Sequence, residues 1–171
     1  MKIDFSQLQT FIECPRRYYN RYKLCLKKIT EDEREVDMNF GKAIHKGLEA
    51  YYKGSDKDNA CKVFNENLTP LAGDQVRTPT HGIVLLTAYI NYYSGSTNEL
   101  GDTHLTTLST VDGKPAVEVK DSFNIGNIEY IVKIDRIVKS NAGNWVQDHK
   151  CTMKSLYTFS NKFTPNMQVS G

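Results

Sequence analysis

The chain has 171 residues, of which 25% are charged and 39% hydrophobic, and its formal net charge is +2. This size suits one globular domain over residues 1–171, and the near-balanced charge does not mark the whole chain as a nucleic-acid binder. The longest apolar stretch, residues 83–90, is far too short to cross a bilayer, and Asp4 interrupts the amino terminus before any signal-like run develops. We therefore expect an intracellular protein without membrane association.

The amino-terminal half of the sequence predicts a series of helices. Ser6 is expected to cap the first helix and Pro15 to begin the second. The acidic stretch over residues 30–39 is interpreted as a connector. Apolar residues at helical spacing then predict three longer helices, over residues 38–53, 57–68 and 81–93.

Basic and aromatic residues are concentrated near the amino terminus. Residues 1–29 contain seven lysines or arginines against two acidic residues. Within them, Arg16 and Arg17 are followed directly by Tyr18 and Tyr19. Such a helix can follow a phosphate backbone and stack on bases, but a solvated helix face accounts for the charge equally well.

From about Thr103 the hydrophobic pattern shifts towards the alternation of strands. Val117 and Val119 indicate a first strand, two further strands follow, and a last helix is predicted from Pro165. This order predicts an α/β (α+β) fold, with a small mixed central sheet flanked by helices and a helical amino-terminal region.

Three charged residues stand on two of the predicted strands. Residues 128–138 are rich in β-branched and aromatic side chains and contain Asp135, and residues 145–151 resume extended character and contain Asp148 and Lys150. Because side chains alternate across a strand, Asp148 and Lys150 project from one face, and Asp135 reaches the same place if the strands pair. Two carboxylates and an ammonium on a rigid sheet can hold a divalent cation and position a water. The pattern therefore indicates metal-dependent chemistry.

Four short motifs follow one another along the chain. They are Cys14-Pro15 with basic and aromatic residues after it, Phe40-Gly41-Lys42-Ala43-Ile44-His45-Lys46-Gly47-Leu48, Ile134-Asp135-Arg136-Ile137 and Asp148-His149-Lys150, with Gln168 beyond them. This ordered set resembles the PD-(D/E)XK nuclease superfamily, specifically its RecB-like exonuclease branch. The resemblance covers nearly the whole chain and implies a restriction-endonuclease-like core.

The resemblance also implies roles for the residues in these motifs. Asp135 and Asp148 would bind Mg²⁺ or Mn²⁺, with His45 and the backbone carbonyl of His149 as further ligands. Lys150 would orient the attacking water and stabilise the charge on the phosphate. The residues expected to contact the substrate are Arg16, Arg17, Tyr18, Tyr19 and Gln168.

Some features depart from the family pattern or stay open. The chain ends soon after Gln168, where the family helix would continue, so we expect a domain truncated at its carboxyl-terminal end or dependent on a protein partner. Cys14 matches the first ligand of the iron–sulfur cluster of some members, but the three later cysteines are missing, so no cluster is expected. Glu118 can serve a second metal ion or equally be a solvated carboxylate.

The function implied is a metal-dependent deoxyribonuclease, an exonuclease acting on single strands or duplex ends. The settings known for such relatives are DNA recombination, repair, replication and CRISPR adaptation. The alternative is a non-catalytic DNA-binding or assembly module that retains the fold. A small-molecule metallohydrolase is disfavoured because the histidines and carboxylates lack the clustering of a zinc site.

Overall fold

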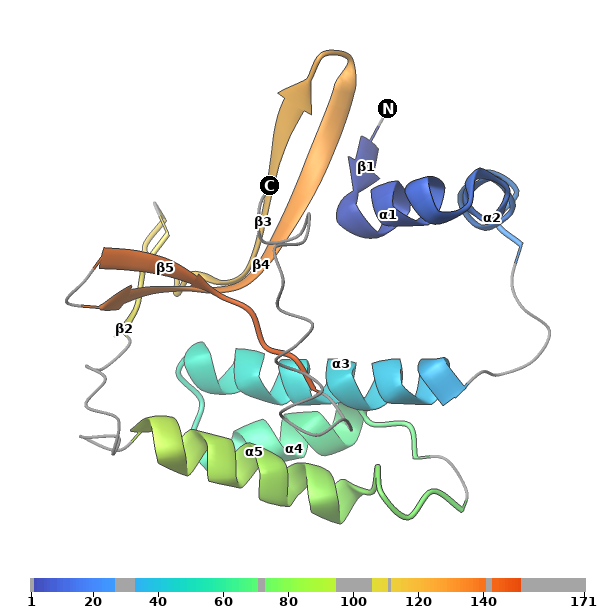
Figure 1. Cartoon of the computed structure of the whole chain (residues 1–171). Helices are drawn as coiled ribbons and strands as arrows, with labels where there is room; N and C mark the ends of the chain where they lie inside the picture. The colour runs from blue at the N-terminus through green and yellow to red at the C-terminus, as the bar shows by residue number, and fades with distance from the viewer. Residues whose placement is uncertain are drawn as a thin grey trace. The chain divides into compact units, whose positions relative to one another are not determined.

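A computed structural model describes residues 2–26, 33–70, 73–94, 106–110, 112–140 and 143–151 of the chain. Within these residues the architecture is mixed α/β, with a five-stranded mixed sheet flanked by helices (Figure 1). The predicted fold class is confirmed. No helix in the described ranges is long and apolar enough to cross a membrane.

The helices and strands follow the predicted order, helices first and most strands later. The helices are α1 (Phe5–Glu13), α2 (Pro15–Tyr18), the π-helix η1 (Tyr19–Lys23), α3 (Glu33–Tyr52), α4 (Lys57–Asn67) and α5 (Pro79–Ser94). The strands are β1 (Lys2–Asp4), β2 (Thr106–Thr107), β3 (Val117–Ile125), β4 (Ile128–Ser140) and β5 (Gly143–Gln147). The helix predicted from Pro165 lies outside the described residues.

The chain divides into two compact units, which are described separately. The first unit contains β1, α1, α2, η1 and residues 120–132 of the β3–β4 hairpin. The second contains α3, α4, α5, β2, β5 and the remaining parts of β3 and β4, residues 117–119 and 133–140. The single domain over residues 1–171 stays a prediction.

In the first unit, a short parallel strand leads directly into the first helix. β1 pairs with β4, with Ile3 opposite Tyr130. The carboxylate of Asp4 then caps α1 by accepting a hydrogen bond of 2.8 Å from the backbone N–H of Gln7. The expectation that Ser6 is the cap is therefore wrong, because the extended residue that precedes the helix is Asp4 and Ser6 is already helical.

In the second unit, three helices pack around one hydrophobic core (Figure 1). Gly82 of α5 allows the close approach of α4, since a Cβ atom at this position would overlap the ring of Phe64. The fully buried Phe64 contributes about 1.5–3 kcal/mol to the free energy of unfolding. The buried core residues are Phe40, Ala43, Ile44, Leu48, Ala60, Phe64, Leu68, Leu86 and Ile90.

The central strand β4 positions the acidic residues of the second unit. β5 pairs with β4 in antiparallel register, with Arg136 opposite Gln147. The predicted pairing of these two strands is confirmed. The next residues outward from this pair are Asp135 on β4 and Asp148 just after β5, so the register brings two carboxylates to the same place.

Candidate functional site

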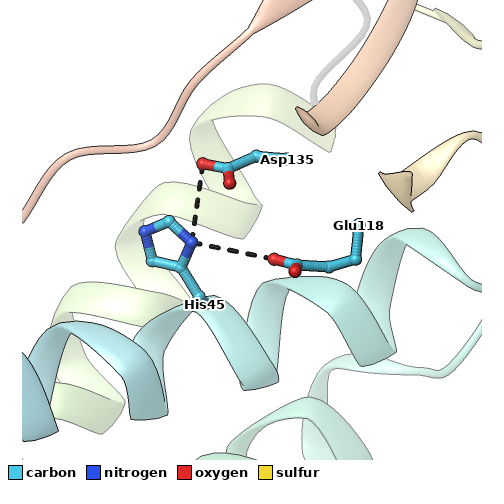
Figure 2. A group of neighbouring side chains, drawn as sticks. All are labelled: His45, Glu118 and Asp135. Carbon is cyan, nitrogen blue, oxygen red and sulfur yellow. Dashed lines mark ion pairs between the residues drawn. The ribbon is translucent and has the colours of Figure 1, made fainter. Parts of the chain in front are cut away.

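Three side chains that can bind a metal ion converge from α3, β3 and β4. His45, Glu118 and Asp135 each offer one nitrogen or oxygen atom, and these atoms all lie within 4.8 Å of one another. His45 Nδ1 is 3.5 Å from Asp135 Oδ2 and 3.8 Å from Glu118 Oε1. Figure 2 shows the imidazole pointing between the two carboxylates. One imidazole nitrogen and two hard carboxylate oxygens are a suitable donor set for a divalent cation.

The position of His45 follows from the helical pattern of α3. Ile44 and Leu48, which flank it on the helix, are buried in the core of the second unit. His45 lies beside this apolar stripe rather than in it, and its side chain is 25% exposed. The helix is therefore fixed by its core face while the imidazole projects to the strands.

Glu118 has an unusual backbone conformation for a strand residue. Its φ is +54°, in the left-handed region that non-glycine residues rarely adopt, and such a conformation costs about 1–3 kcal/mol. The preceding residues Ala116 and Val117 are buried, and the Ala116 carbonyl accepts a hydrogen bond of 2.9 Å from the Ile137 N–H. These contacts hold the chain just before the bend, and the Glu118 side chain is only 11% exposed.

Asp135 is surrounded by polar groups despite its burial. Its Oδ2 accepts a hydrogen bond of 2.8 Å from the backbone N–H of His149. Burial raises the pKa of Asp135 above its ordinary value, and the charge of Asp148 and a hydrogen bond with it act in the same direction. The His149 N–H and the charge of His45 oppose this rise in pKa. Asp135 and Asp148 are therefore close neighbours that repel each other when both are ionised, which a bound cation would relieve.

The imidazole of His149 points into the unit and contacts two helices. Its Nε2 lies 2.9 Å from the hydroxyl of Tyr89 on α5, and its ring stacks on Tyr52 of α3 with centroids 6.0 Å apart. Burial lowers the pKa of His149 to about 4, so the ring is neutral near neutral pH. The segment after β5 is thus anchored by a side chain as well as by its backbone.

Arg136 lies next to Asp135 and is almost completely buried, at 4% exposure. Its guanidinium stacks 3.7 Å from the centre of the Tyr52 ring. Nε donates a hydrogen bond of 2.8 Å to Thr107 Oγ1, and Nη1 donates one of 2.9 Å to Gln147 Oε1. One side chain therefore ties β4 to β2, β5 and α3 beside the candidate metal ligands.

A family model of the PD-(D/E)XK nuclease superfamily matches residues 3–170. The chain belongs to this superfamily. Its members are nucleases that use divalent metal ions, which agrees with the donor set described above, and their restriction-endonuclease-like fold agrees with the mixed sheet and flanking helices. Comparison with curated proteins and with solved structures found no match.

The structure of this superfamily member places the predicted metal ligands as follows. His45 and Asp135 lie together, and Asp148 lies beside Asp135 but is not one of the three convergent residues. Glu118 joins the group directly, with its side chain 11% exposed, and a role for it at a second metal ion stays a prediction. His149 faces Asp135 through its N–H, and its carbonyl stays a predicted ligand.

Lys150 and Gln168 are the two remaining predicted residues at the carboxyl-terminal end of the chain. Lys150 is exposed and groups with the first unit. Gln168 lies outside the described residues. The roles of both in a PD-(D/E)XK nuclease stay predictions.

The predicted substrate-binding residues lie on α2 and at the start of η1. Arg16, Arg17 and Tyr19 are exposed, so these side chains are accessible to a large ligand. Tyr18 is half-buried and packs edge-on against Phe11 of α1, with ring centroids 5.5 Å apart. Tyr18 therefore contributes at least in part to packing, and DNA contact by these residues stays a prediction.

Three residues that contact the candidate metal group or His149 beside it were not identified from the sequence. Lys133 lies 2.5 Å from Glu118 Oε2, and it precedes Asp135 by two residues, so the alternation of strand side chains could have identified it. Tyr52 and Tyr89 lie on helices among apolar residues. Nothing in the local pattern distinguishes them from ordinary core tyrosines.

Proposed function

We propose that this protein is a metal-dependent deoxyribonuclease of the RecB-like branch that acts as an exonuclease on single strands or duplex ends. The convergence of His45, Glu118 and Asp135 carries the proposal, since the chain belongs to a nuclease superfamily. The ordered motifs, from Cys14-Pro15 to Asp148-His149-Lys150, support the branch.

The residues at the site fit a divalent cation, which we take to be Mg²⁺ or Mn²⁺. His45, Glu118 and Asp135 would hold it, with Asp148 and the His149 carbonyl as further ligands. Bound there, the cation would supply Lewis acidity and a water of lowered pKa for attack on the phosphodiester. The protein's part is to hold the carboxylates in place before the substrate arrives, which the hydrogen bond from His149 to Asp135 does.

Other residues would handle the substrate. Lys150 would orient the attacking water and stabilise the charge that develops on the phosphate. The exposed Arg16, Arg17 and Tyr19 would follow the DNA backbone and stack on bases. A role inside the cell in DNA recombination, repair, replication or CRISPR adaptation belongs to the same proposal.

The experiment compares end-labelled linear DNA, single-stranded and duplex, with circular DNA, in Mg²⁺, in Mn²⁺ and in chelator. We expect metal-dependent shortening of linear DNA from its ends and no cutting of circles. The Lys150→Ala protein should cut about 10²–10³-fold more slowly, because one preorganised charge is lost. Cutting of circles would show an endonuclease, and no cutting by a folded protein that binds Mn²⁺ would show a non-catalytic module.

A further inference from the structure

Lys133 forms an ion pair with one of the candidate metal ligands. Its Nζ lies 2.5 Å from Oε2 of Glu118, whereas Oε1 of the same carboxylate faces His45 Nδ1 at 3.8 Å. The two oxygens of Glu118 are thus divided between the ammonium and the candidate metal position. Lys133 and Asp135 also lie on the same face of β4, because they are two residues apart in a strand.

The exposure of these side chains shows which of them a large ligand can reach. The side chains of His45, Glu118 and Asp135 are 25%, 11% and 12% exposed. The side chain of Lys133 is 55% exposed, although it touches Glu118 directly. Within the second unit, Lys133 therefore contacts a largely buried carboxylate while its own ammonium stays accessible to solvent. A polymer that approaches the carboxylates from solvent can reach this ammonium.

Charge balance gives this ammonium a function. Glu118 and Asp135 carry two negative charges, and Asp148 beside them adds a third. A divalent cation compensates two of the three, and the nearby Arg136 guanidinium is buried and contacts Tyr52, Thr107 and Gln147. Lys133 supplies, from within the second unit, a positive charge that is exposed to solvent and can face a phosphodiester.

We propose that Lys133 contacts the phosphodiester of the substrate at this site and is a catalytic residue of the nuclease, in addition to the predicted Lys150. The inference rests on the proposed function. It identifies the group that the ammonium contacts, which is a phosphate oxygen of the nucleic-acid backbone. Lys133 holds Glu118 in the resting protein and turns to the phosphate when Glu118 is bound to a cation.

The first test compares Lys133→Met, Lys133→Arg and a matched control, Lys53→Met. Lys53 pairs with Glu49 at 2.6 Å and is 46% exposed. It therefore resembles Lys133 in the length of its ion pair and in its exposure, but it lies outside the candidate group. We expect Lys133→Met to lower kcat/KM for DNA about a hundredfold, Lys133→Arg to retain most activity, and Lys53→Met to match the wild type. Lys133→Arg and Lys53→Met should keep the wild-type melting temperature, and Lys133→Met should stay folded at the assay temperature with a lower melting temperature, because Glu118 loses its ammonium partner.

The second readout is Mn²⁺ binding in the absence of DNA, measured by titration calorimetry. Because Lys133 is not a ligand, Lys133→Met should bind Mn²⁺ at least as tightly as the wild type. A loss of Mn²⁺ affinity that parallels the loss of activity would overturn the proposal, since Lys133 would then only position Glu118. Wild-type kcat/KM in Lys133→Met, or an equal loss in Lys53→Met, would also overturn it.

A third readout does not depend on cleavage, so it separates this inference from the proposed function. In chelator, Glu118→Gln protein leaves Lys133 without its carboxylate partner. Binding of single-stranded DNA by Glu118→Gln should have a steeper salt dependence than binding by Glu118→Gln/Lys133→Met, by about 0.7 in the slope of log K against log salt. Equal slopes would contradict the phosphate contact even if the wild type proves to be a nuclease.

Discussion

Glu118 illustrates how a single residue can depart from its local sequence pattern. A carboxylate at 11% exposure requires polar partners, and Glu118 pairs with the ammonium of Lys133 and lies beside the imidazole of His45. Strand alternation predicts only that Glu118 opposes its valine neighbours, and it says nothing of a left-handed φ. The sequence therefore left its role open, whereas the residues inside recognisable motifs, His45 and Asp135, were identified correctly as neighbours.

Glu118→Gln keeps the shape of this side chain and removes its charge. We expect Mn²⁺ affinity, measured by calorimetry, to fall by at least about tenfold. Mutation of a residue that only supports a metal ligand lowers affinity by about this factor, and loss of a ligand should lower it at least as much. Glu49→Gln is the matched control, since Glu49 also lies between charged partners and is 16% exposed. Equal Mn²⁺ affinity in Glu118→Gln and the wild type would remove Glu118 from the metal centre.

At the scale of elements, four side chains brace the candidate site. Arg136 of β4 stacks on Tyr52 of α3, Tyr52 stacks on His149 after β5, and His149 contacts Tyr89 of α5. The hydroxyls of Tyr52 and Tyr89 are 3.1 Å apart and close the network. The network joins two helices to the segment that carries Asp148 and the N–H donor to Asp135, so it should determine how precisely the ligands are held.

Tyr89→Phe removes only the hydroxyl from this network. We expect a loss of about 1 kcal/mol in the free energy of unfolding, from one hydrogen-bonding group, and a fall of about tenfold in Mn²⁺ affinity. Tyr92→Phe is the control, because Tyr92 lies on the same helix and is 46% exposed. A lower stability with unchanged Mn²⁺ affinity would show that the network supports the fold and not the metal centre.

Helices were predicted correctly where buried apolar residues recur at helical spacing in the sequence. The apolar stripe that contains Ile44 and Leu48 predicted α3, but the helix begins at Glu33, within the stretch interpreted as a connector. Acidic residues stabilise the amino-terminal end of a helix, so the same charges that suggested a solvated connector also suit a helix start. β1 was missed because a strand of three residues shows no period, and its pairing with β4 joins distant parts of the sequence.

At the scale of the whole molecule, the candidate site depends on contacts that no local pattern encodes. His45 comes from a helix that is far in the sequence from the two consecutive strands that carry Glu118 and Asp135. Motif order predicted that His45 and Asp135 meet, and strand pairing predicted that Asp135 meets Asp148. The network of Tyr52, Tyr89, His149 and Arg136, and the contact of Lys133 with Glu118, required the folded chain.

The central claim is that the convergent residues form a metal centre required for cutting DNA. The most direct measurement is the cleavage rate of end-labelled single-stranded DNA against Mn²⁺ concentration for the wild type and Asp135→Asn. Asparagine can still accept the hydrogen bond from His149, and burial already disfavours the ionised form of Asp135, so the variant should fold. We predict a metal-dependent rate for the wild type and a loss of about a thousandfold or more in Asp135→Asn. Equal rates for the two proteins at every Mn²⁺ concentration would contradict the account.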